Sequence, residues 1–497
     1  MKNVADLQKE NTLLRDQLAH QKSINATLVE KIQLLLNRQF KPSSEKISPD
    51  QLGLFNEAEE LVVEESNATQ PEVTTVKSHE RKSRPRVSIP DYYPREDIVY
   101  DISNAEKVCP HDGSELKVIG SEDHEQLDII PAKIKVIRHV RLKYACPCCE
   151  QHVITASKPK QPIEKSIASP SLLAFVATQK YADALPLYRQ TEMFKRIGIA
   201  LDRTNLANWM VRCGELVQPL INLLNEHIQS QSVVHLDETT LQVLDEPGKP
   251  AQSKSYLWLA AAFGEQSACV YHYRDNRSQT VPLELLEQSV KAIMVDGYEG
   301  YQKACDTYQI KRLGCWAHAR RKFVDAQKLQ KKTGKADQAI NFIQKLYAIE
   351  KRTKDQPPNE RYRVRQQEAV PIIEKFRDWK DKSLATVLPA TALGKALTYL
   401  NNQWDRLAGY LENGNYPIDN NPAERAIRPF TIGRKNWLFS KSQAGAKASA
   451  NLYSLIETAK ANDLNVYEYL SYIFQELPNA QSVEDIEALL PWNVTLG

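Results

Sequence analysis

The sequence predicts a multidomain α+β protein. Three observations lead to this prediction: a heptad pattern at the N-terminus, a cysteine-containing segment with strand-like alternation, and a long helical segment followed by short β-branched runs. The chain has 497 residues, and domains usually hold about 100–200 residues, so three or four domains are expected. The predicted parts are residues 1–40, 41–94, 95–160, 161–230, 231–475 and 476–497, the last being a C-terminal tail.

Charge and hydropathy exclude several classes of protein. The net charge is only +3, so any positive charge that binds DNA must be local. No apolar run reaches the length of a membrane span, and the N-terminus lacks the apolar core of a signal peptide. We therefore expect a cytoplasmic protein with no membrane partner. In that compartment its eight cysteines are expected to be thiols or metal ligands rather than disulfides.

Residues 1–40 show the heptad repeat of a coiled coil. The positions that alternate in steps of three and four are Val4, Leu7, Asn11, Leu14, Leu18, Gln21, Asn25, Leu28, Ile32 and Leu35. Such a pattern buries one helix face against a partner helix, and a buried asparagine fixes the register. We predict a leucine-zipper-like homodimer. An amphipathic helix folded onto its own chain is the alternative.

Residues 41–94 are predicted to be a linker with a basic arm. An acidic stretch, EAEELVVEES, precedes a run of cations at Arg81, Lys82, Arg84 and Arg86. Two interpretations stay open for this run. It is either a solvated charge cluster or an arm that binds the phosphate backbone of DNA.

Residues 95–160 contain an incomplete set of zinc ligands. Two short knuckles are separated by strand-like stretches, which is the frame of a zinc ribbon. The predicted ligands are Cys109, Cys146, Cys149 and either His111 or Asp112. Zinc prefers an imidazole to a carboxylate as the fourth ligand. We predict a small β-rich module with a structural Zn²⁺, and ordinary buried cysteines are the alternative.

Residues 161–230 have helical periodicity throughout, and part of this segment has the outline of a helix-turn-helix. A first helix is expected to end near Ile197, with Gly198 in the turn and Asp202 capping a second helix. The second helix of this motif enters the major groove of DNA. Its candidate contact residues are Arg203, Asn205 and Asn208. Two packed helices without a DNA role are the alternative.

From residue 232 onward, β-branched and aromatic runs predict the strands of one sheet. Asp237 lies near the end of the first run, and Asp296 ends a later run before Gly297. Acids at neighbouring strand ends suit two Mg²⁺ or Mn²⁺ ions, which activate an attacking oxygen and stabilise a leaving one. Taken singly, each aspartate is more typical of a cap or turn.

A helix that begins near Asn421 would carry a third carboxylate, Glu424. Asn421 or Asp419 is expected to cap it, and Pro422 suits its first turn. Glu424 and Arg428 are four residues apart and can face one site, although an isolated pair of this kind usually only stabilises the helix. Further cations supply the local positive charge that DNA binding requires. They are Arg425, Arg434, Lys435, Lys441 and Lys447.

The chain between Asp296 and Glu424 is too long for one connection, and we predict a helical insertion at about 324–410. Cys315 and His318 form a C-x-x-H pair ahead of it. We interpret the pair as structural because no second pair lies nearby, with a metal site as the alternative. The residues here that can contact the scissile phosphate or flanking DNA are His318, Arg320, Arg321 and Lys322.

Long blocks of the sequence resemble the signature of the insertion sequence 66 family of bacterial transposases. They are HLDETT, MVDGYEGY, GCWAHARRKF, YPIDNNPAERAIRPFTIGRKNWLFS and LLPW, with FKPSSEK, DQLGLFNEAE and PLYRQ towards the N-terminus. The resemblance extends from about Leu7 to Trp492. It implies an RNase H-like core in which Asp237, Asp296 and Glu424 form the metal-binding triad. Asp112 departs from the family's usual two-cysteine first knuckle.

The function that this resemblance implies is that of a DDE transposase. Such an enzyme binds the terminal repeats of its element and performs metal-dependent strand cleavage and strand transfer into target DNA. The resemblance also implies a nucleoid-associated bacterial protein and companion proteins from the same element. Two rival functions are a sequence-specific DNA-binding regulator and an RNase H-like nuclease without strand transfer. Cleavage of terminal-repeat DNA tests the first rival, and joining of a pre-cleaved end tests the second.

Overall fold

The computed structural model describes residues 134–145, 153–329 and 333–496, together with Gln21, Lys107, His111 and Ser114. The predicted coiled coil and basic linker, and the zinc ligands Cys109, Asp112, Cys146 and Cys149, lie outside these residues, apart from the helical Gln21. The chain divides into two compact units. The large unit is Met1–Ala68 with Pro159–Gly497, and the small unit is Thr69–Lys158.

In the small unit, the described residues form a β-hairpin. Strands β1 (Lys143–Ala145) and β2 (Val153–Thr155) pair antiparallel, with Tyr144 opposite Ile154. The Nε of Arg141 donates a hydrogen bond of 2.6 Å to the carbonyl of Ala156 beside this pair. In the sequence, the two strands bracket the C-x-x-C knuckle that is predicted to bind zinc.

A mixed six-stranded sheet forms the centre of the large unit. Its strands are β3 (Val233–Asp245), β4 (Lys254–Ala262), β5 (Ala268–Arg274), β6 (Ala292–Val295), β7 (Lys311–Gly314) and β8 (Ser440–Ser442). The order is β5-β4-β3-β6-β7, and β8 pairs with the last part of β3. β3, β4 and β5 are antiparallel, whereas β6 and β7 run parallel to β3. β6 is buried along its whole length, which fits its continuous apolar sequence.

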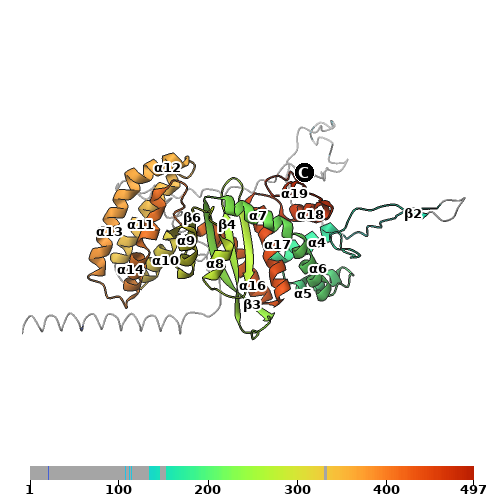
Figure 1. Cartoon of the computed structure of the whole chain (residues 1–497), viewed down its shortest axis with the longest axis horizontal. Coiled ribbons are helices and arrows are strands. Elements are labelled where there is room, and N and C mark those ends of the chain that lie inside the picture. The colour runs from blue at the N-terminus through green and yellow to red at the C-terminus, as the bar shows by residue number, and fades with distance from the viewer. Residues whose placement is uncertain are drawn as a thin grey trace, which may run out of the picture. The chain divides into compact units, whose positions relative to one another are not determined.

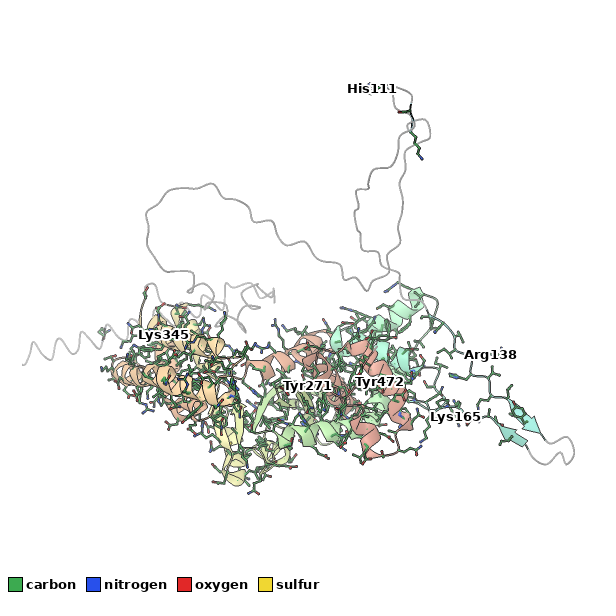
Figure 2. All side chains as sticks on the ribbon, turned by 90° about the horizontal axis from the view of Figure 1, so that it is seen from above. His111, Arg138, Lys165, Tyr271, Lys345 and Tyr472 are labelled. Atoms are coloured by element: carbon green, nitrogen blue, oxygen red, sulfur yellow. The ribbon has the colours of Figure 1, made fainter. Side chains whose placement is uncertain are left out.

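Helices cover the sheet and its outer edge. They are α7 (Gln218–Ser230), α8 (Thr280–Leu285), α9 (Gln302–Tyr308), α16 (Asn421–Trp437) and α17 (Gln443–Ala461), with the 3-10 turn η2 (Glu299–Tyr301). β5 is an edge strand, and α17 satisfies its free amides. The hydroxyl of Thr458 accepts from the amide of Cys269, and that of Ser454 accepts from Tyr271. Tyr271 therefore lies inside the large unit (Figure 2).

The segment before the sheet is helical, as the periodicity predicts. It contains α4 (Pro170–Ala177), the π-helix η1 (Thr178–Ala182), α5 (Leu187–Arg196) and α6 (Arg203–Leu216). α5 ends at Arg196, and Gly198 follows with a φ of +86°, a conformation that favours glycine. Asp202 then accepts a 2.8 Å bond from the amide of Thr204 and caps α6.

The C-terminal residues pack onto the large unit instead of forming a tail. They include α18 (Val466–Glu476), η5 (Leu477–Asn479) and α19 (Val483–Glu487). Leu489 and Leu490 are buried, and the Trp492 ring lies 4.5 Å from the ring of His227 on α7. The prediction of a tail at 476–497 was therefore wrong, because its apolar residues complete the core. Among the described residues, none of the helices has both the length and the apolarity that a membrane span requires.

The helical insertion has a hydrophobic core of its own. Its elements are α10 (Trp316–Gln327), α11 (Lys335–Arg352), α12 (Pro358–Val364), the π-helix η3 (Arg365–Ala369), α13 (Val370–Leu384), α14 (Ala392–Asn402), α15 (Trp404–Ala408) and the 3-10 turn η4 (Gly409–Glu412). In Figure 1, α11 to α14 form one group beside the sheet. The Phe376 ring lies 5.9 Å from Trp316 and 4.8 Å from Phe342. This aromatic cluster joins α10, which follows β7, to α11 and α13.

The close contact of α6 with α17 gives a test of the fold. A Cβ added at Gly214 would lie 2.5 Å from the Cα of Ala448, so the helices must separate. We expect Gly214→Ala to lower the free energy of unfolding by about 1–3 kcal/mol, the usual cost of overpacking. Thermal unfolding of the purified chain measures this loss.

The matched control is Gly445→Ala on α17. Its added Cβ would lie 3.6 Å from the Oγ of Ser442, an ordinary contact. We expect no loss of stability, or a gain of up to about 1 kcal/mol, because alanine favours the helix. Equal melting temperatures for the two variants would contradict the described packing of α6 against α17.

Candidate active site

Two of the predicted acids lie on adjacent parallel strands. β3 and β6 pair with His235 opposite Met294. Continuing this register by two residues places Asp237 beside Asp296, the first residue after β6. Both side chains are partly exposed. Their placement follows from strand pairing alone, which explains how residues far apart in the sequence meet.

The position of Asp237 within its strand differs from the prediction. We expected Asp237 near the end of a strand, but β3 continues to Asp245. The strand is longer because β4 pairs with it through Gln242 and β8 pairs with Val243 and Asp245. Asp237 is therefore in the middle of β3, level with the end of β6.

The third acid, Glu424, lies in the first turn of α16 and is 8% exposed. The N-cap of α16 is Asn420, so the prediction of Asn421 or Asp419 as the cap was wrong; Asn421 is the first helical residue. Asp419 lies one residue before the cap, and its Oδ1 accepts a 3.0 Å bond from the amide of Asn421. Its other oxygen accepts a 2.6 Å bond from the hydroxyl of Tyr347 on α11. The insertion therefore supports the start of the helix that carries Glu424.

Asn420 connects the chain segments that carry the acids, and the sequence analysis missed it. Its Nδ2 donates a 2.9 Å hydrogen bond to the carbonyl of Leu236, the residue before Asp237. Its carbonyl accepts a 3.0 Å hydrogen bond from the amide of Glu424. Its own amide donates a 3.2 Å hydrogen bond to the Sγ of Cys315. One buried asparagine thus ties β3 and the start of α10 to α16.

His235 completes the junction around Asn420. Its Nδ1 lies 2.8 Å from the Oδ1 of Asn420, which is an acceptor, so the Nδ1 donates. Burial lowers the pKa of His235 to about 4, and the imidazole is therefore neutral at physiological pH. The residue acts as a fixed hydrogen-bond donor within the sheet.

The three carboxylates act on one another electrostatically. Burial raises the pKa of Asp237 well above its usual value, and the negative charges of Glu238, Glu424 and Asp296 raise it further. Like charges gathered in this way are stabilised by a cation. Oxygen ligands are those that Mg²⁺ and Mn²⁺ prefer, so the donor set fits these ions.

Glu424 has one oxygen without a hydrogen-bond partner. Its Oε1 is buried and lies 3.3 Å from the Nδ1 of His318, and neither atom makes a hydrogen bond among the described residues. Its Oε2 accepts a 2.9 Å bond from the Nη2 of Arg321. A buried carboxylate oxygen left in this state is suited to a metal ligand.

The C-x-x-H pair lies at the same acid. In the described part of the chain, ligand atoms of Cys315, His318 and Glu424 all lie within 4.8 Å of one another, and Asp237 and Asp296 are not in this group. The Sγ of Cys315 already accepts a bond from Asn420, and burial raises the pKa of this thiol well above its usual value. Both observations favour the structural interpretation of Cys315.

The structure separates the predicted DNA contacts by their exposure. Arg203, Asn205 and Asn208 are exposed on α6, and Arg425 and Lys435 are exposed on α16. Arg428 is partly exposed. These positions are compatible with contact to DNA.

Two of the predicted contact residues are directed into the protein. Arg320 is 5% exposed and its charge acts on Tyr347 of the insertion, which favours a supporting role over a direct contact with DNA. Arg434 donates from its Nη1 to the carbonyl of Thr240 and, at 3.1 Å, to the Oγ1 of Thr239. It holds α16 against β3, so its charge is directed to the protein and not to solvent.

A fourth acid, Glu238, flanks the site and was also missed. The Glu238 carboxylate pairs with the guanidinium of Arg277 and accepts from the hydroxyl of Tyr301. Glu238 follows Asp237 on β3, and neighbouring strand residues point to opposite faces. Glu238 stands in the HLDETT block, directly after Asp237. The spacing in the sequence does not show which of two adjacent acids pairs with a cation and which is a candidate metal ligand.

Comparison with known proteins places the chain in a family. Residues 165–448 match the model of the Transposase IS66 family. Residues 106–150 match the zinc-finger binding domain of transposase IS66, and 454–492 match the IS66 C-terminal element. Residues 27–98 match the leucine-zipper model described as Transposase C of IS166 homeodomain. The chain belongs to the Transposase IS66 family.

Three similar proteins come from Sinorhizobium fredii. Uncharacterized protein y4jD is 30% identical over 445 residues, which cover 86% of each chain. Uncharacterized protein y4qI is 32% identical over 394 residues, covering 77% of this chain and 72% of that protein. Uncharacterized protein y4hP is 28% identical over 473 residues, covering 89% and 84%. The similarity thus extends over most of each protein.

The repulsion among the acids predicts a pH-dependent effect on stability. The raised pKa of Asp237 means that its ionisation costs more in the folded than in the unfolded chain. Without metal, folding stability therefore falls as pH rises from the unfolded-state value of about 3.9 through the folded pKa. We expect Asp237→Asn to raise the melting temperature at neutral pH in EDTA, and to leave it unchanged below about pH 4.

Asp325→Asn on the exposed part of α10 is the matched control for this measurement. It removes the same charge from an exposed residue that is not among the groups acting on Asp237, and it should leave the melting temperature unchanged. A neutral-pH melting temperature for Asp237→Asn at or below that of the control would count against mutual repulsion of the carboxylates.

Proposed function

We propose that this protein is a DNA transposase that uses Asp237, Asp296 and Glu424 as a DDE triad in an RNase H-like core. The observation that carries the proposal is the sheet topology. A mixed sheet of order β5-β4-β3-β6-β7 carries Asp237 on β3 and Asp296 directly after the adjacent parallel strand β6. Glu424 joins them from α16, and its charge acts on Asp237.

The three acids would hold two Mg²⁺ or Mn²⁺ ions. When bound, such ions activate the attacking oxygen and stabilise the leaving oxygen of an in-line displacement. The protein's own part is to fix the carboxylates. β3 and β6 set the spacing of Asp237 and Asp296, and the bonds of Asn420 set α16 relative to β3.

The proposed reaction has two displacements at phosphorus. In the first, water attacks at the end of the element, and the bond to the 3′ oxygen breaks to leave a 3′ hydroxyl. In the second, this hydroxyl attacks a phosphodiester of target DNA, forming a new bond while the target's 3′ oxygen leaves. Neither step forms a covalent protein–DNA intermediate, so none of the chain's nucleophiles is required.

The cations around the acids would bind the DNA backbone. Arg425 and Lys435 are exposed on the helix that carries Glu424, and Arg428 is partly exposed there. Arg321 contacts Glu424 and is partly exposed, within reach of a phosphate bound at the acids. Local positive charge of this kind supplies most of the affinity for DNA regardless of sequence.

Recognition of the element ends is assigned to separate modules. Arg203, Asn205 and Asn208 on α6 would read base edges, and the zinc finger, with its structural Zn²⁺, would add contacts. The N-terminal zipper would pair two copies of the chain and hence two ends. Companion proteins of the same element would act on this complex.

Loss of any triad acid should abolish cleavage. We expect Asp237→Asn, Asp296→Asn and Glu424→Gln each to reduce strand cleavage by at least about 100-fold, because each removes a charged metal ligand. Binding to terminal-repeat DNA should persist, since α6 and the zinc finger are unchanged. The measurement is cleavage and gel-shift of labelled element ends with Mg²⁺. Full cleavage by one variant would remove that residue from the triad.

The ion pair of Arg321 with Glu424 predicts two effects of opposite sign. The guanidinium lies 2.9 Å from an oxygen that a metal ion would need. We expect Arg321→Gln to bind Mn²⁺ several-fold more tightly, while cleavage falls about tenfold or more through loss of a phosphate contact. Calorimetric titration with Mn²⁺ and the cleavage assay measure the two effects.

Arg352→Gln, which breaks an exposed ion pair with Glu368, is the control and should change neither quantity. If Arg321→Gln lowered both Mn²⁺ affinity and cleavage, Arg321 would be a structural support of Glu424 and not its competitor with metal.

A further inference from the structure

A large cleft lies between the sheet and the helical insertion, at the first turn of α16, and none of the three acids is among its lining residues. Its volume is about 1180 Å³, above the usual size of about 300–1,000 Å³ for small-molecule pockets. One side is lined by the start of β3 and the turn between β4 and β5, and the other by α11 and α12. Asn421, Pro422 and Arg425 of α16 line it beside Glu424.

Cations dominate the charge of this cleft. Lys351, Lys354, Arg361 and Arg425 line it, and none of them forms an ion pair with an acid among the described residues. Three acids also line the cleft; Glu265 is exposed in the same turn as Phe263, and the other two are engaged. Glu350 pairs with Arg365 at 2.6 Å, and Asp419 accepts bonds from Tyr347 and Asn421. The cations are thus available to a polyanion.

An aromatic ring also lines this space, and two of the lining residues each carry a buried polar atom without a partner. Phe263 is 36% exposed, and its ring is held edge-on to His235 at 5.2 Å between centroids. The Oδ1 of Asn421 and the Nε of Arg361 are buried without hydrogen-bond partners within the described ranges.

We infer that this cleft binds a single strand of DNA at the first turn of α16, the helix that carries Glu424. Sites for single-stranded DNA combine a cationic groove that follows the backbone with aromatic side chains on which bases stack. Phe263 can stack only on a base whose face is free, whereas the bases of a duplex are stacked on one another. The occupant is therefore an unpaired segment at the element end, with its phosphates towards Lys351, Lys354 and Arg361.

The inference rests on the proposed function, because the strand it names is one that would be separated for cleavage at the acids. It adds a substrate requirement: the ends are partly unpaired when the acids act. It also gives the insertion a second role besides supporting Asp419 through Tyr347.

The first test is binding of fluorescein-labelled oligothymidylate to the full-length protein in EDTA. We expect Phe263→Ala to weaken binding by roughly 5- to 100-fold, the effect of losing one stacked base. The control is Tyr472→Ala, an aromatic residue on α18 that is 38% exposed and lies outside the cleft (Figure 2). Equal affinity of the two variants would overturn the inference.

The second test compares the binding of oligothymidylate by lysine variants inside and outside the cleft. Lys351→Glu with Lys354→Glu should weaken binding and reduce its salt dependence, because fewer phosphates are neutralised. Lys345→Glu lies on α11, the helix that carries Lys351, is exposed and outside the cleft, and should have little effect (Figure 2). An equal loss with Lys345→Glu would show a general effect of charge and overturn the inference.

Photo-crosslinking separates the cleft from the other DNA-binding parts. An oligonucleotide carrying 5-iododeoxyuridine should form adducts on the peptide that contains Phe263, as mapped by mass spectrometry. Adducts confined to other segments, such as α6, would overturn the inference. Cleavage of element ends without adducts in the cleft would reject this inference alone. Adducts in the cleft without any cleavage would reject the proposed function alone.

Discussion

The hydrogen bonds of Asn420 are the contact on which the site depends. Through its side chain it holds the backbone of β3 beside Asp237, and through its own backbone it holds Glu424 and Cys315. These bonds are buried, so each lost partner would leave an unsatisfied polar group. The sheet, the third acid and the insertion therefore keep one relative position, which a constellation of metal ligands requires.

This rigid junction holds together groups that repel one another. The negative charges of Asp296, Glu238 and Glu424 oppose ionisation of Asp237, while Arg277 and Arg321 neutralise part of the cluster from its sides. Keeping these carboxylates close lowers the free energy of unfolding, and the other contacts of the fold offset this loss. The chain belongs to the Transposase IS66 family. The chemistry that we propose for it needs divalent cations at a phosphodiester, and closely placed carboxylates would bind them.

Local patterns predicted much of this protein, and long-range pairing supplied the rest. The runs around Asp237 and Asp296 and the capped α6 were readable because alternation, turns and caps are local signals. The short β7 was missed, because KRLG has no alternation and becomes a strand only by pairing with β6. Asn420 was missed because its role comes from partners distant in sequence. Glu424 was selected by family resemblance, since its spacing from Arg428 alone describes an ordinary helix pair.

The most direct test of the central claim is anomalous X-ray scattering from Mn²⁺ in crystals of the full-length protein with element-end DNA. The proposed function predicts Mn²⁺ bound by the carboxylates of Asp237, Asp296 and Glu424. Mn²⁺ held by Cys315, His318 and Glu424 without Asp237 would contradict it, as would an ordered complex with no Mn²⁺ at these acids.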